Sequence, residues 1–365
     1  MSVERIDIAQ ALELIQTPGA LSALIDARSP TEFEHDRLPG AANWPSLTDE
    51  ERTQVGTEYK QVSAFEARKR GAAMVARNIA RHLDREMPGL GRDWKPLVYC
   101  WRGGQRSGAL ALVLSQIGFE VRVLQGGYRA FRQHVVSALE QASQGLRFEV
   151  LCGKTGSGKS RLLQALERAG AQVLDLEALA CHRGSVLGAL PGTPQPSQKR
   201  FETLLWQALS TLDRKRPVFV ESESRLVGQL RLPPSLLDHI RRSPCWRIEM
   251  PMGARVALLK EDYVHLSMDP VRLSERLMSL RELRGASVVS QWCEWAHQGQ
   301  IDALVLQLLQ LHYDPIYIRS MSKNFPGFDV ASVVDLPSGQ GPDLEAAVGQ
   351  LLQSRPLSLD VSRPA

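Results

Sequence analysis

The chain has 365 residues, of which 43% are hydrophobic and 23% are charged, and these ordinary values exclude a largely disordered or fibrous protein. Its 44 basic and 40 acidic side chains give a net charge of +4, a mild excess that is compatible with an anionic partner. No run approaches the ~18 apolar residues of a membrane-spanning helix. The charged N-terminal segment lacks the apolar core of a signal peptide, so we expect no membrane association and a cytoplasmic location.

Short apolar runs alternate with helical patterns in the first part of the chain. The runs at 21–27, 96–100 and 121–124 predict strands, and the segments 8–16, 64–86, 107–117 and 128–143 predict helices. Buried strands that alternate with helices predict a parallel sheet covered on both faces. We therefore expect an α/β domain over residues 1–140, followed by a polar linker at 141–147.

The α/β rhythm continues beyond the linker. Strands are predicted at 148–152, 172–176 and 217–221, with a helix at 159–169 and a helical region at 254–312. A second domain over 148–325, with a helical extension, follows from this pattern. The segment after 320 is richer in Gly and Pro, so we expect it to pack loosely. We assign 326–365 as a C-terminal tail with a short helix at 343–353.

The cysteines point to a reactive thiol rather than to a scaffold. Five scattered cysteines with no CxxC pair argue against a disulfide framework and against zinc. Cys100 ends an apolar strand and is followed by a Gly-rich loop and a helix that begins near Ser107. Loop N–H groups, the helix N-terminus, Arg102 and Arg106 favour negative charge at the sulfur, which predicts a lowered pKa and a thiolate. The alternative is a buried structural cysteine, which the C-x-R-x-G-x-R spacing disfavours.

The surroundings of this loop resemble a rhodanese domain, the sulfurtransferase module. The matching positions are 25–28, 32–33, 35, 38–41, 43, 124, 126–128 and 130–131. The resemblance implies a rhodanese-like parallel-sheet fold and a cysteine that carries a sulfur-group atom. A related fold serves as a phosphatase, but the single-turn loop here is typical of sulfur carriers.

A phosphate-binding loop follows the strand at 148–152. The motif G-x-x-x-x-G-K-[ST] is formed by Gly153, Lys154, Thr155, Gly156, Ser157, Gly158, Lys159 and Ser160. Backbone N–H groups of such a loop face a phosphate, Lys159 reaches the outer phosphate and Ser160 can hold Mg²⁺. The second domain is therefore predicted to be P-loop NTPase-like, although a diphosphate satisfies the same groups as a nucleoside triphosphate.

Acidic residues at strand ends could contact the metal or the diphosphate. The candidates are Asp175 and Glu177 after one strand, and Glu221 and Glu223 at the end of another. Helix capping and ordinary solvation of strand ends remain alternatives for each of them.

The fusion of the two modules resembles tRNA 2-selenouridine synthase. Further matching positions are 51–52, 55–56, 59–60, 175–177, 182–185, 221–225 and 313–317, so the resemblance spans roughly 10–320. It implies that Arg183, Ser185 and Arg225 belong to the substrate site. The resemblance does not extend to the segment after 325.

The resemblance implies a two-step reaction on tRNA with 2-thiouridine at the wobble position. Geranyl diphosphate first alkylates the sulfur, and selenium from selenophosphate then replaces it, with an S-selanylcysteine intermediate at Cys100. No tightly bound cofactor is expected, Mg²⁺ is an optional ligand, and we expect a monomer. Candidate tRNA-binding patches are Arg68–Arg70 with Arg77 and Arg81, Arg214–Arg216, Arg241–Arg242, and Arg272, Arg276, Arg281 and Arg284.

Two other functions stay open. In an ATP-dependent tRNA thiolase, the P-loop would adenylate the base and Cys100 would donate sulfur. In a non-catalytic rhodanese-like signalling protein, Cys100 would be dispensable, which the intact cysteine loop disfavours.

Overall fold

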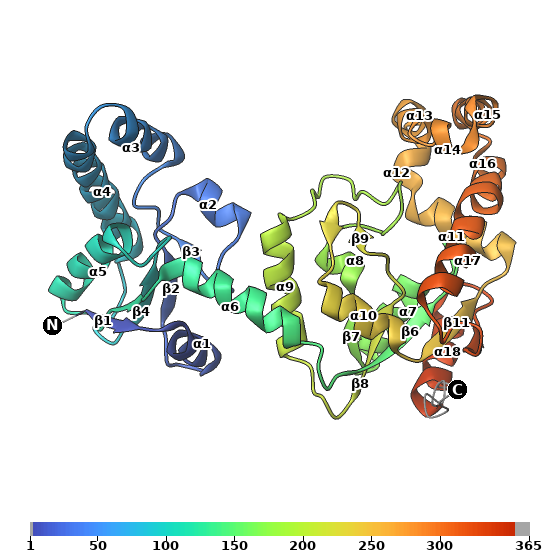
Figure 1. The fold of residues 1–365 in the computed structure, drawn as a ribbon, viewed down its shortest axis with the longest axis horizontal. Coiled ribbons are helices and arrows are strands. Elements are labelled where there is room, and N and C mark those ends of the chain that lie inside the picture. The colour runs from blue at the N-terminus through green and yellow to red at the C-terminus, as the bar shows by residue number, and fades with distance from the viewer. Residues whose placement is uncertain (1–2, 355–365) are drawn as a thin grey trace. The chain divides into compact units, whose positions relative to one another are not determined.

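The computed structural model describes residues 3–354 and divides into two compact units. Among these residues, the first unit contains the chain up to residue 139 together with 196–207, and the second contains residues 140–195 and the chain from residue 208 onward. Each unit has its own parallel sheet (Figure 1). Each also has its own hydrophobic core. No helix in the described part of the chain is long and apolar enough to span a membrane.

A five-stranded sheet of order β1-β5-β4-β2-β3 forms the centre of the first unit, and all its pairings are parallel. Its strands are β1 (Glu4–Ile6), β2 (Ala23–Asp26), β3 (Ala42–Asn43), β4 (Pro96–Tyr99) and β5 (Arg122–Leu124). The helices are α1 (Ile8–Gln16), α2 (Pro30–His35), α3 (Asp49–Gln61), α4 (Ala64–Glu86), α5 (Gln105–Ile117) and α6 (Gly127–Gln141). The three predicted strands and four predicted helices are confirmed, whereas β1, β3, α2 and α3 were not predicted.

Local sequence explains these elements. All four residues of β4 are buried, as expected for a central strand covered on both faces. Helix α3 begins with a capping box in which Thr48 and Glu51 satisfy each other's backbone N–H groups. Ser63 then caps α4, whose buried face contributes Met74 and Ile79 to the core.

The second unit is built on a parallel sheet of order β12-β11-β6-β8-β7. Its strands are β6 (Arg147–Cys152), β7 (Gln172–Leu174), β8 (Pro217–Glu221), β11 (Cys245–Glu249) and β12 (Ser332–Asp335), with a hairpin of β9 (Leu226–Val227) and β10 (Leu230–Arg231). Helices α7 (Lys159–Arg168), α8 (Leu176–Leu179) and α10 (Pro234–Arg242) connect these strands. Helix α9 (Gln198–Ser210) lies between β7 and β8 in sequence, but its residues 198–207 belong to the first unit.

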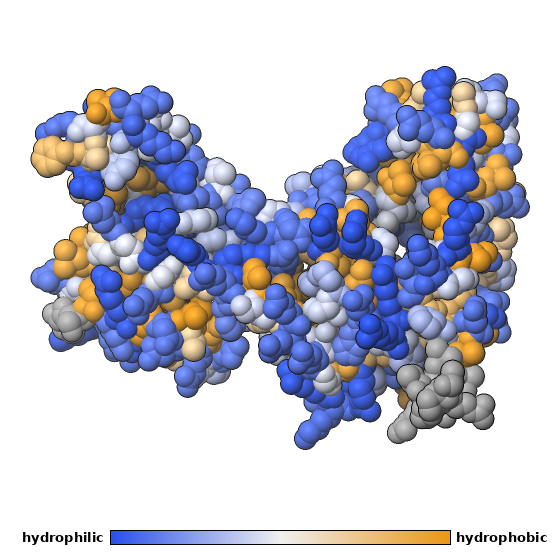
Figure 2. All heavy atoms as spheres, in the orientation of Figure 1, coloured by the Kyte–Doolittle hydropathy of each residue, from blue (hydrophilic) through white to orange (hydrophobic). Residues whose placement is uncertain are grey.

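The helical extension follows β11. It comprises α11 (Met252–Asp262), α12 (Val264–Ser267), α13 (Pro270–Met278), α14 (Arg281–Arg284), α15 (Ala286–His297), α16 (Ile301–Gln307), the π-helix η1 (Leu308–Tyr313) and α17 (Asp314–Asn324). Pro315 explains the π-helical turn, because proline cannot donate to the preceding turn and its ring clashes with the carbonyl there. Hydrophobic side chains on the visible surface of this region lie among hydrophilic ones (Figure 2).

The expectation of a loosely packed tail at 326–365 was wrong for the residues that the structure describes. β12 pairs with β11 along four residues, and α18 (Gly341–Gln353) packs on α7, as the helix expected at 343–353. Val334, Leu336 and Leu351 belong to the same buried cluster as Leu162 on α7. Glycine and proline lie around β12 and α18 but do not prevent them from forming. The burial of apolar side chains outweighs the preference of Gly and Pro for turns and loops. The part of the tail at 355–365 lies outside the described residues.

Candidate functional site

Cys100 lies directly after β4, at the start of a loop that leads into α5. The thiol is 3% exposed and ends a strand that is buried along its whole length. Two backbone hydrogen bonds join this loop to the start of α6. The Tyr128 N–H donates to the Cys100 carbonyl at 2.8 Å, and the Arg129 N–H donates to the Trp101 carbonyl at 3.1 Å.

Glycine is required where the two loops touch. A Cβ on Gly103 would lie 2.4 Å from the Leu124 carbonyl oxygen, and a Cβ on Gly127 would lie 2.2 Å from the Cys100 carbonyl oxygen. Both residues also have a positive φ. The two backbones therefore approach too closely for any side chain, and this contact fixes the loop around the sulfur.

The Ser107 hydroxyl is a functional group that sequence reasoning missed. Its Oγ donates to the Cys100 Sγ at 3.1 Å, and the Gly104 carbonyl lies at 3.3 Å from the same hydroxyl. Burial by itself would raise the pKa of the thiol. Hydrogen bonds from the Ser107 hydroxyl and N–H, together with the charge of Arg106, outweigh burial and lower the pKa of Cys100. The sequence signal that could have predicted this contact is the position of Ser107, seven residues after the cysteine and in the first turn of α5.

The two arginines of the loop differ in their surroundings. Arg106 donates to Glu32 Oε2 at 2.8 Å, and the same carboxylate pairs with Arg52. The Arg102 side chain is exposed. Arg106 therefore braces the loop against α2, while Arg102 is available to an incoming anion.

The P-loop has the expected strand–loop–helix context, with β6 before it and α7 beginning at Lys159. Gly156 and Gly158 have φ values of +76° and +80°. Lys159 Nζ donates to the Gly153 carbonyl at 2.6 Å. The Ser160 hydroxyl lies 3.0 Å from Glu177 Oε2 and 3.3 Å from Glu221 Oε2, so the loop serine directly meets two of the predicted acids.

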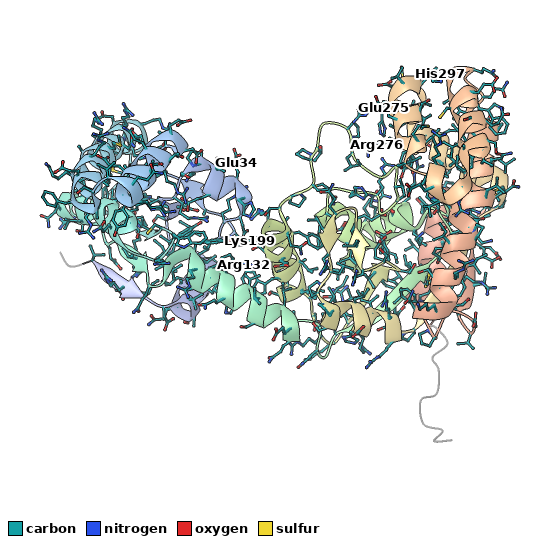
Figure 3. All side chains as sticks on the ribbon, turned by 45° about the horizontal axis from the view of Figure 1, so that its top comes forward. Glu34, Arg132, Lys199, Glu275, Arg276 and His297 are labelled. Carbon is teal, nitrogen blue, oxygen red and sulfur yellow. The ribbon has the colours of Figure 1, made fainter. Side chains whose placement is uncertain are left out.

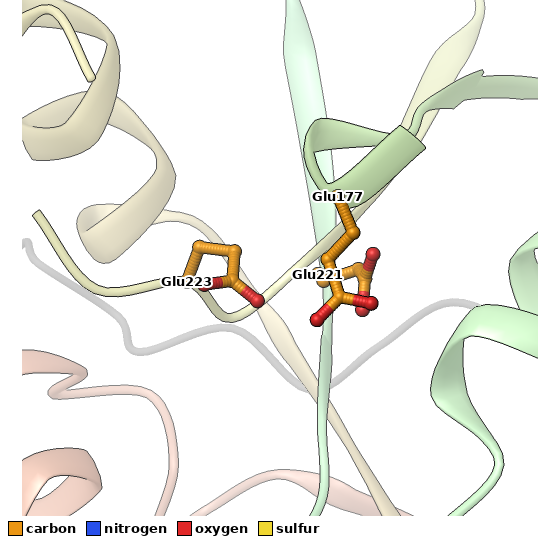
Figure 4. A group of neighbouring side chains, drawn as sticks. All are labelled: Glu177, Glu221 and Glu223. Carbon is orange, nitrogen blue, oxygen red and sulfur yellow. The ribbon is translucent and has the colours of Figure 1, made fainter. Parts of the chain in front are cut away.

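Three of the four candidate acids form one cluster (Figure 4). One carboxylate oxygen each of Glu177, Glu221 and Glu223 lies within 4.8 Å of the others. Burial and the neighbouring Glu177 carboxylate raise the pKa of Glu223 to about 8, despite the opposing charge of Lys159. Burial and the neighbouring carboxylates also raise the pKa of Glu221 well above its usual range. The Glu221 Oε1 atom is buried and has no hydrogen-bond partner among the described residues.

The fourth acid, Asp175, has a different position. Its carboxylate accepts from the Ala178 N–H at 2.8 Å and caps α8. The capping alternative therefore describes Asp175, and the structure does not bring it into the carboxylate cluster.

The segment 182–185 covers the carboxylates. A Cβ on Gly184 would lie 2.6 Å from Glu177 Oε1 and 3.1 Å from Glu223 Oε1. Arg183 lies over the Tyr263 ring, 5.2 Å from its centroid, and the Ser185 hydroxyl is 3.3 Å from the Tyr263 hydroxyl. Arg225, in contrast, is exposed after β8, and no side-chain contact joins it to this group within residues 3–354.

An apolar pocket begins at the P-loop and extends into the helical extension. Its polar end contains Thr155, Ser185, Tyr263 and Tyr313, and its remaining wall is mainly aliphatic. The aliphatic residues are Leu187, Leu259, Leu266, Leu273, Ile301, Leu304, Val305, Leu308 and Leu309. The pocket holds about 580 Å³ of empty space, including the part that is open to solvent. None of these aliphatic side chains was predicted, because they converge only through the packing of α11, α12, α13, α16 and η1.

Comparison with known sequences agrees with this two-unit arrangement. A rhodanese-like domain model matches residues 7–134, and a model described as the tRNA 2-selenouridine synthase AAA domain matches residues 146–282. A tRNA 2-selenouridine synthase of Alcanivorax borkumensis is 38% identical over 343 residues, covering 82% of this chain and 90% of that protein. The chain belongs to the tRNA 2-selenouridine synthase family.

Two other synthases of this family show the same relation. The protein of Aeromonas salmonicida is 34% identical over 330 residues, covering 82% of this chain and 87% of its own length. The protein of Nitrosomonas europaea is 39% identical over 263 residues, covering 71% of this chain and 66% of its own length. Cys100, the P-loop and the glutamate cluster all lie within the two family matches.

Proposed function

We propose that this protein converts 2-thiouridine to 2-selenouridine at the wobble position of tRNA. In the first step, the base sulfur is alkylated by geranyl diphosphate at the P-loop. In the second step, selenium from selenophosphate replaces the alkylated sulfur by way of Cys100. The family relatives are named for the overall conversion, and the two steps are supported by the residues around each site.

The pocket beside the P-loop is the observation that carries the alkylation step. One end adjoins a loop suited to a diphosphate, and the rest is lined by leucine, isoleucine and valine. A hydrocarbon diphosphate matches both parts, with its diphosphate at the loop and its hydrocarbon chain against the aliphatic wall. A nucleotide would place a polar base and ribose against an aliphatic wall, so the pocket favours an alkyl donor over the ATP of a thiolase.

The chemistry of the first step suits these residues. The thiocarbonyl sulfur attacks the allylic carbon, the carbon–oxygen bond breaks and the diphosphate leaves with the electron pair. The N3 proton of the base is released to solvent, which gives the neutral S-alkyl product. Lys159 and the loop N–H groups stabilise the charge that develops on the leaving group. Ser160, Glu221 and the neighbouring Glu177 and Glu223 would hold a Mg²⁺ ion, for which the unpartnered Glu221 Oε1 is suited. The ion would neutralise charge on the diphosphate.

The second step assigns a carrier role to Cys100. Alkylation makes C2 of the base electrophilic and turns the sulfur into a better leaving group. The exposed Arg102 can attract the anionic selenium donor, and a thiol with a lowered pKa can bind its selenium as an S–Se group when a disulfide takes up the two electrons released. The bound selenium then attacks C2, the alkylated sulfur leaves as geranylthiol, and a thiol reductant supplies the two electrons that break the S–Se bond.

A reconstituted reaction tests both steps. Purified protein is incubated with RNA that contains 2-thiouridine, geranyl diphosphate and selenophosphate, and the nucleosides are followed by mass spectrometry. Cys100→Ala should accumulate S-geranyl-2-thiouridine without 2-selenouridine, and Lys159→Ala should form neither product. Full selenation by Cys100→Ala would contradict the carrier role. Sulfur transfer that requires ATP and proceeds without geranyl diphosphate would favour the thiolase.

A further inference from the structure

A buried guanidinium from α11 holds the middle of the P-loop. Arg255 is 3% exposed, and its Nε and Nη2 atoms donate to the Thr155 carbonyl oxygen at 2.9 and 2.7 Å. The other edge of the guanidinium donates to the Asp314 carboxylate, with Nη1–Oδ2 at 2.9 Å and Nη2–Oδ1 at 2.6 Å. Arg255 thus links the loop to the first residue of α17 through four hydrogen bonds.

This contact determines the orientation of one peptide group. In a trans peptide the C=O and N–H bonds point in opposite directions. Because the Thr155 carbonyl points to Arg255, the Gly156 N–H must point away from Arg255. Gly156 has a φ of +76°, and glycine also tolerates the conformations on the other side of a peptide flip. Without Arg255, the backbone itself would do little to prevent that flip.

The packing around Gly156 shows that α11 and the loop are in direct contact. A Cβ at this position would lie 2.8 Å from the Leu259 side chain and 3.3 Å from the Arg255 carbonyl oxygen. In the described part of the chain, the Gly156 N–H has no hydrogen-bond acceptor of its own. A backbone donor of this kind in a P-loop is available to an anion.

Asp314 completes the arrangement. Its side chain is 13% exposed, and removing it would leave the Arg255 charge buried without a counter-charge. The π-helix η1 directly precedes Asp314, and the same η1 and α11 contribute Leu308 and Leu259 to the apolar pocket. The ion pair therefore joins the P-loop to two walls of that pocket.

We propose that Arg255 is a positioning residue that, held by Asp314, keeps the Gly156 N–H directed into the phosphate site. The proposal rests on the proposed function only in so far as the P-loop binds a diphosphate. Arg255 does not touch the diphosphate, and its effect passes through the Thr155–Gly156 peptide.

Calorimetric titration of the full chain with inorganic diphosphate and Mg²⁺ tests this role. Arg255→Lys keeps the buried charge but cannot reproduce the fork of hydrogen bonds, and Asp314→Glu keeps the counter-charge but displaces it. Both variants should bind diphosphate roughly tenfold or more weakly, the effect expected when one hydrogen bond to a charged group is removed. Arg247→Lys is the matched control, because Arg247 forms a partly exposed pair with Glu249 on β11, and its affinity should equal that of the parent.

The dissociation constant and the binding stoichiometry separate positioning from stability. A purely structural role would lower the melting temperature or the fraction of binding-competent molecules and leave the dissociation constant unchanged, which would overturn the proposal. Parent-like affinity in both variants would also overturn it. Absence of diphosphate binding by the parent itself would instead overturn the diphosphate site on which the proposal rests.

Discussion

At the residue scale, the Cys100 loop shows how a buried thiol acquires a lowered pKa. Burial opposes ionisation, and the opposing contributions come first from the Ser107 hydroxyl and N–H and then from Arg106. The effect of the arginine charges on the thiol was predicted from the sequence. The hydrogen bond from the Ser107 hydroxyl was not predicted, because it depends on how the first turn of α5 faces the end of β4.

Replacing Ser107 by alanine should raise the pKa of Cys100, because a hydrogen bond that favours the thiolate is removed. The rate of alkylation by iodoacetamide, followed on the Cys100 peptide by mass spectrometry, should rise at higher pH than in the parent. Ser107→Thr retains the hydroxyl and should restore the parent profile. Superimposable pH profiles for the alanine variant and the parent would show that the hydroxyl contact is incidental.

The glutamate cluster predicts a pH dependence of stability. Glu223 has a pKa of about 8 in the folded protein against an ordinary value of 4.5, so between these values the folded state holds a proton that the unfolded state lacks. The free energy of unfolding of the metal-free protein should therefore fall as the pH rises through this window. Calorimetry at about pH 5.5 and about pH 8 should show the decrease, and a smaller decrease for Glu223→Gln.

The same calorimetric measurement can be repeated with added Mg²⁺. Because the ion needs ionised carboxylates, added Mg²⁺ should raise the melting temperature more at about pH 8 than at about pH 5.5. Equal effects of Mg²⁺ on the parent and on Glu221→Gln would assign the cluster to packing rather than to metal binding.

At the element scale, the candidate tRNA-binding patches of the second unit differ in the edge of the sheet at which they lie. Residues 214–216 directly precede β8, and residues 241–242 end α10 shortly before β11 begins. Both groups therefore lie at the amino edge of a parallel sheet whose carboxyl edge holds the P-loop. Helix α13 is different. Burial lowers the pKa of His182, in the segment that covers the carboxylates, and the charge of Arg276 on α13 (Figure 3) lowers it further. We therefore expect α13 to meet the RNA.

Charge reversal tests this assignment. The double variant Arg272→Glu/Arg276→Glu should weaken tRNA binding and reduce the slope of log affinity against log salt by about 0.7–0.9 for each phosphate that is no longer neutralised. Filter binding over a range of salt concentrations gives the slope. Arg214→Glu/Arg216→Glu is the control at the opposite edge of the sheet. A larger effect of this control than of the α13 variant would place the RNA at the amino edge.

At the scale of the whole molecule, α9 packs in a different unit from the one that its position in the sequence suggests. Residues 196–207 lie between two strands of the second sheet in sequence but pack in the first unit. There Trp206 meets Phe131 edge to face with the ring centroids 5.7 Å apart, and Thr203 donates to Asp36 at 3.0 Å. A contiguous first domain of residues 1–140 would lack these contacts.

Trp206→Ala should therefore destabilise the first unit, by about 3–5 kcal/mol for the loss of a buried aromatic side chain. Hydrogen exchange followed by mass spectrometry should show faster exchange in peptides around Phe131. Trp292→Ala, which removes a fully buried tryptophan of the helical extension, should instead affect peptides of the second unit. Faster exchange confined to the second unit in Trp206→Ala would contradict the assignment of α9.

Features that depend on local order along the chain could be predicted from the sequence alone. The apolar runs of β2, β4, β6 and β8 predicted buried parallel strands, and a continuous motif predicted the P-loop between β6 and α7. Spacing around Cys100 likewise predicted a thiol with a lowered pKa, because loop, helix start and arginines all lie within seven residues. Such features are readable because their interacting groups are neighbours in sequence.

Which distant residues meet became known only from the packed structure. Glu177, Glu221 and Glu223 form one cluster, whereas the Asp175 carboxylate caps α8. Asp175 precedes the first residue of α8 and Glu177 lies within it, so the two side chains leave the backbone in different directions. β12 and α18 became core elements because they cover apolar surface of β11 and α7. The apolar pocket and the Arg255–Asp314 pair depend on helices about 60 residues apart, and no local pattern encodes a contact that exists only after these helices have packed.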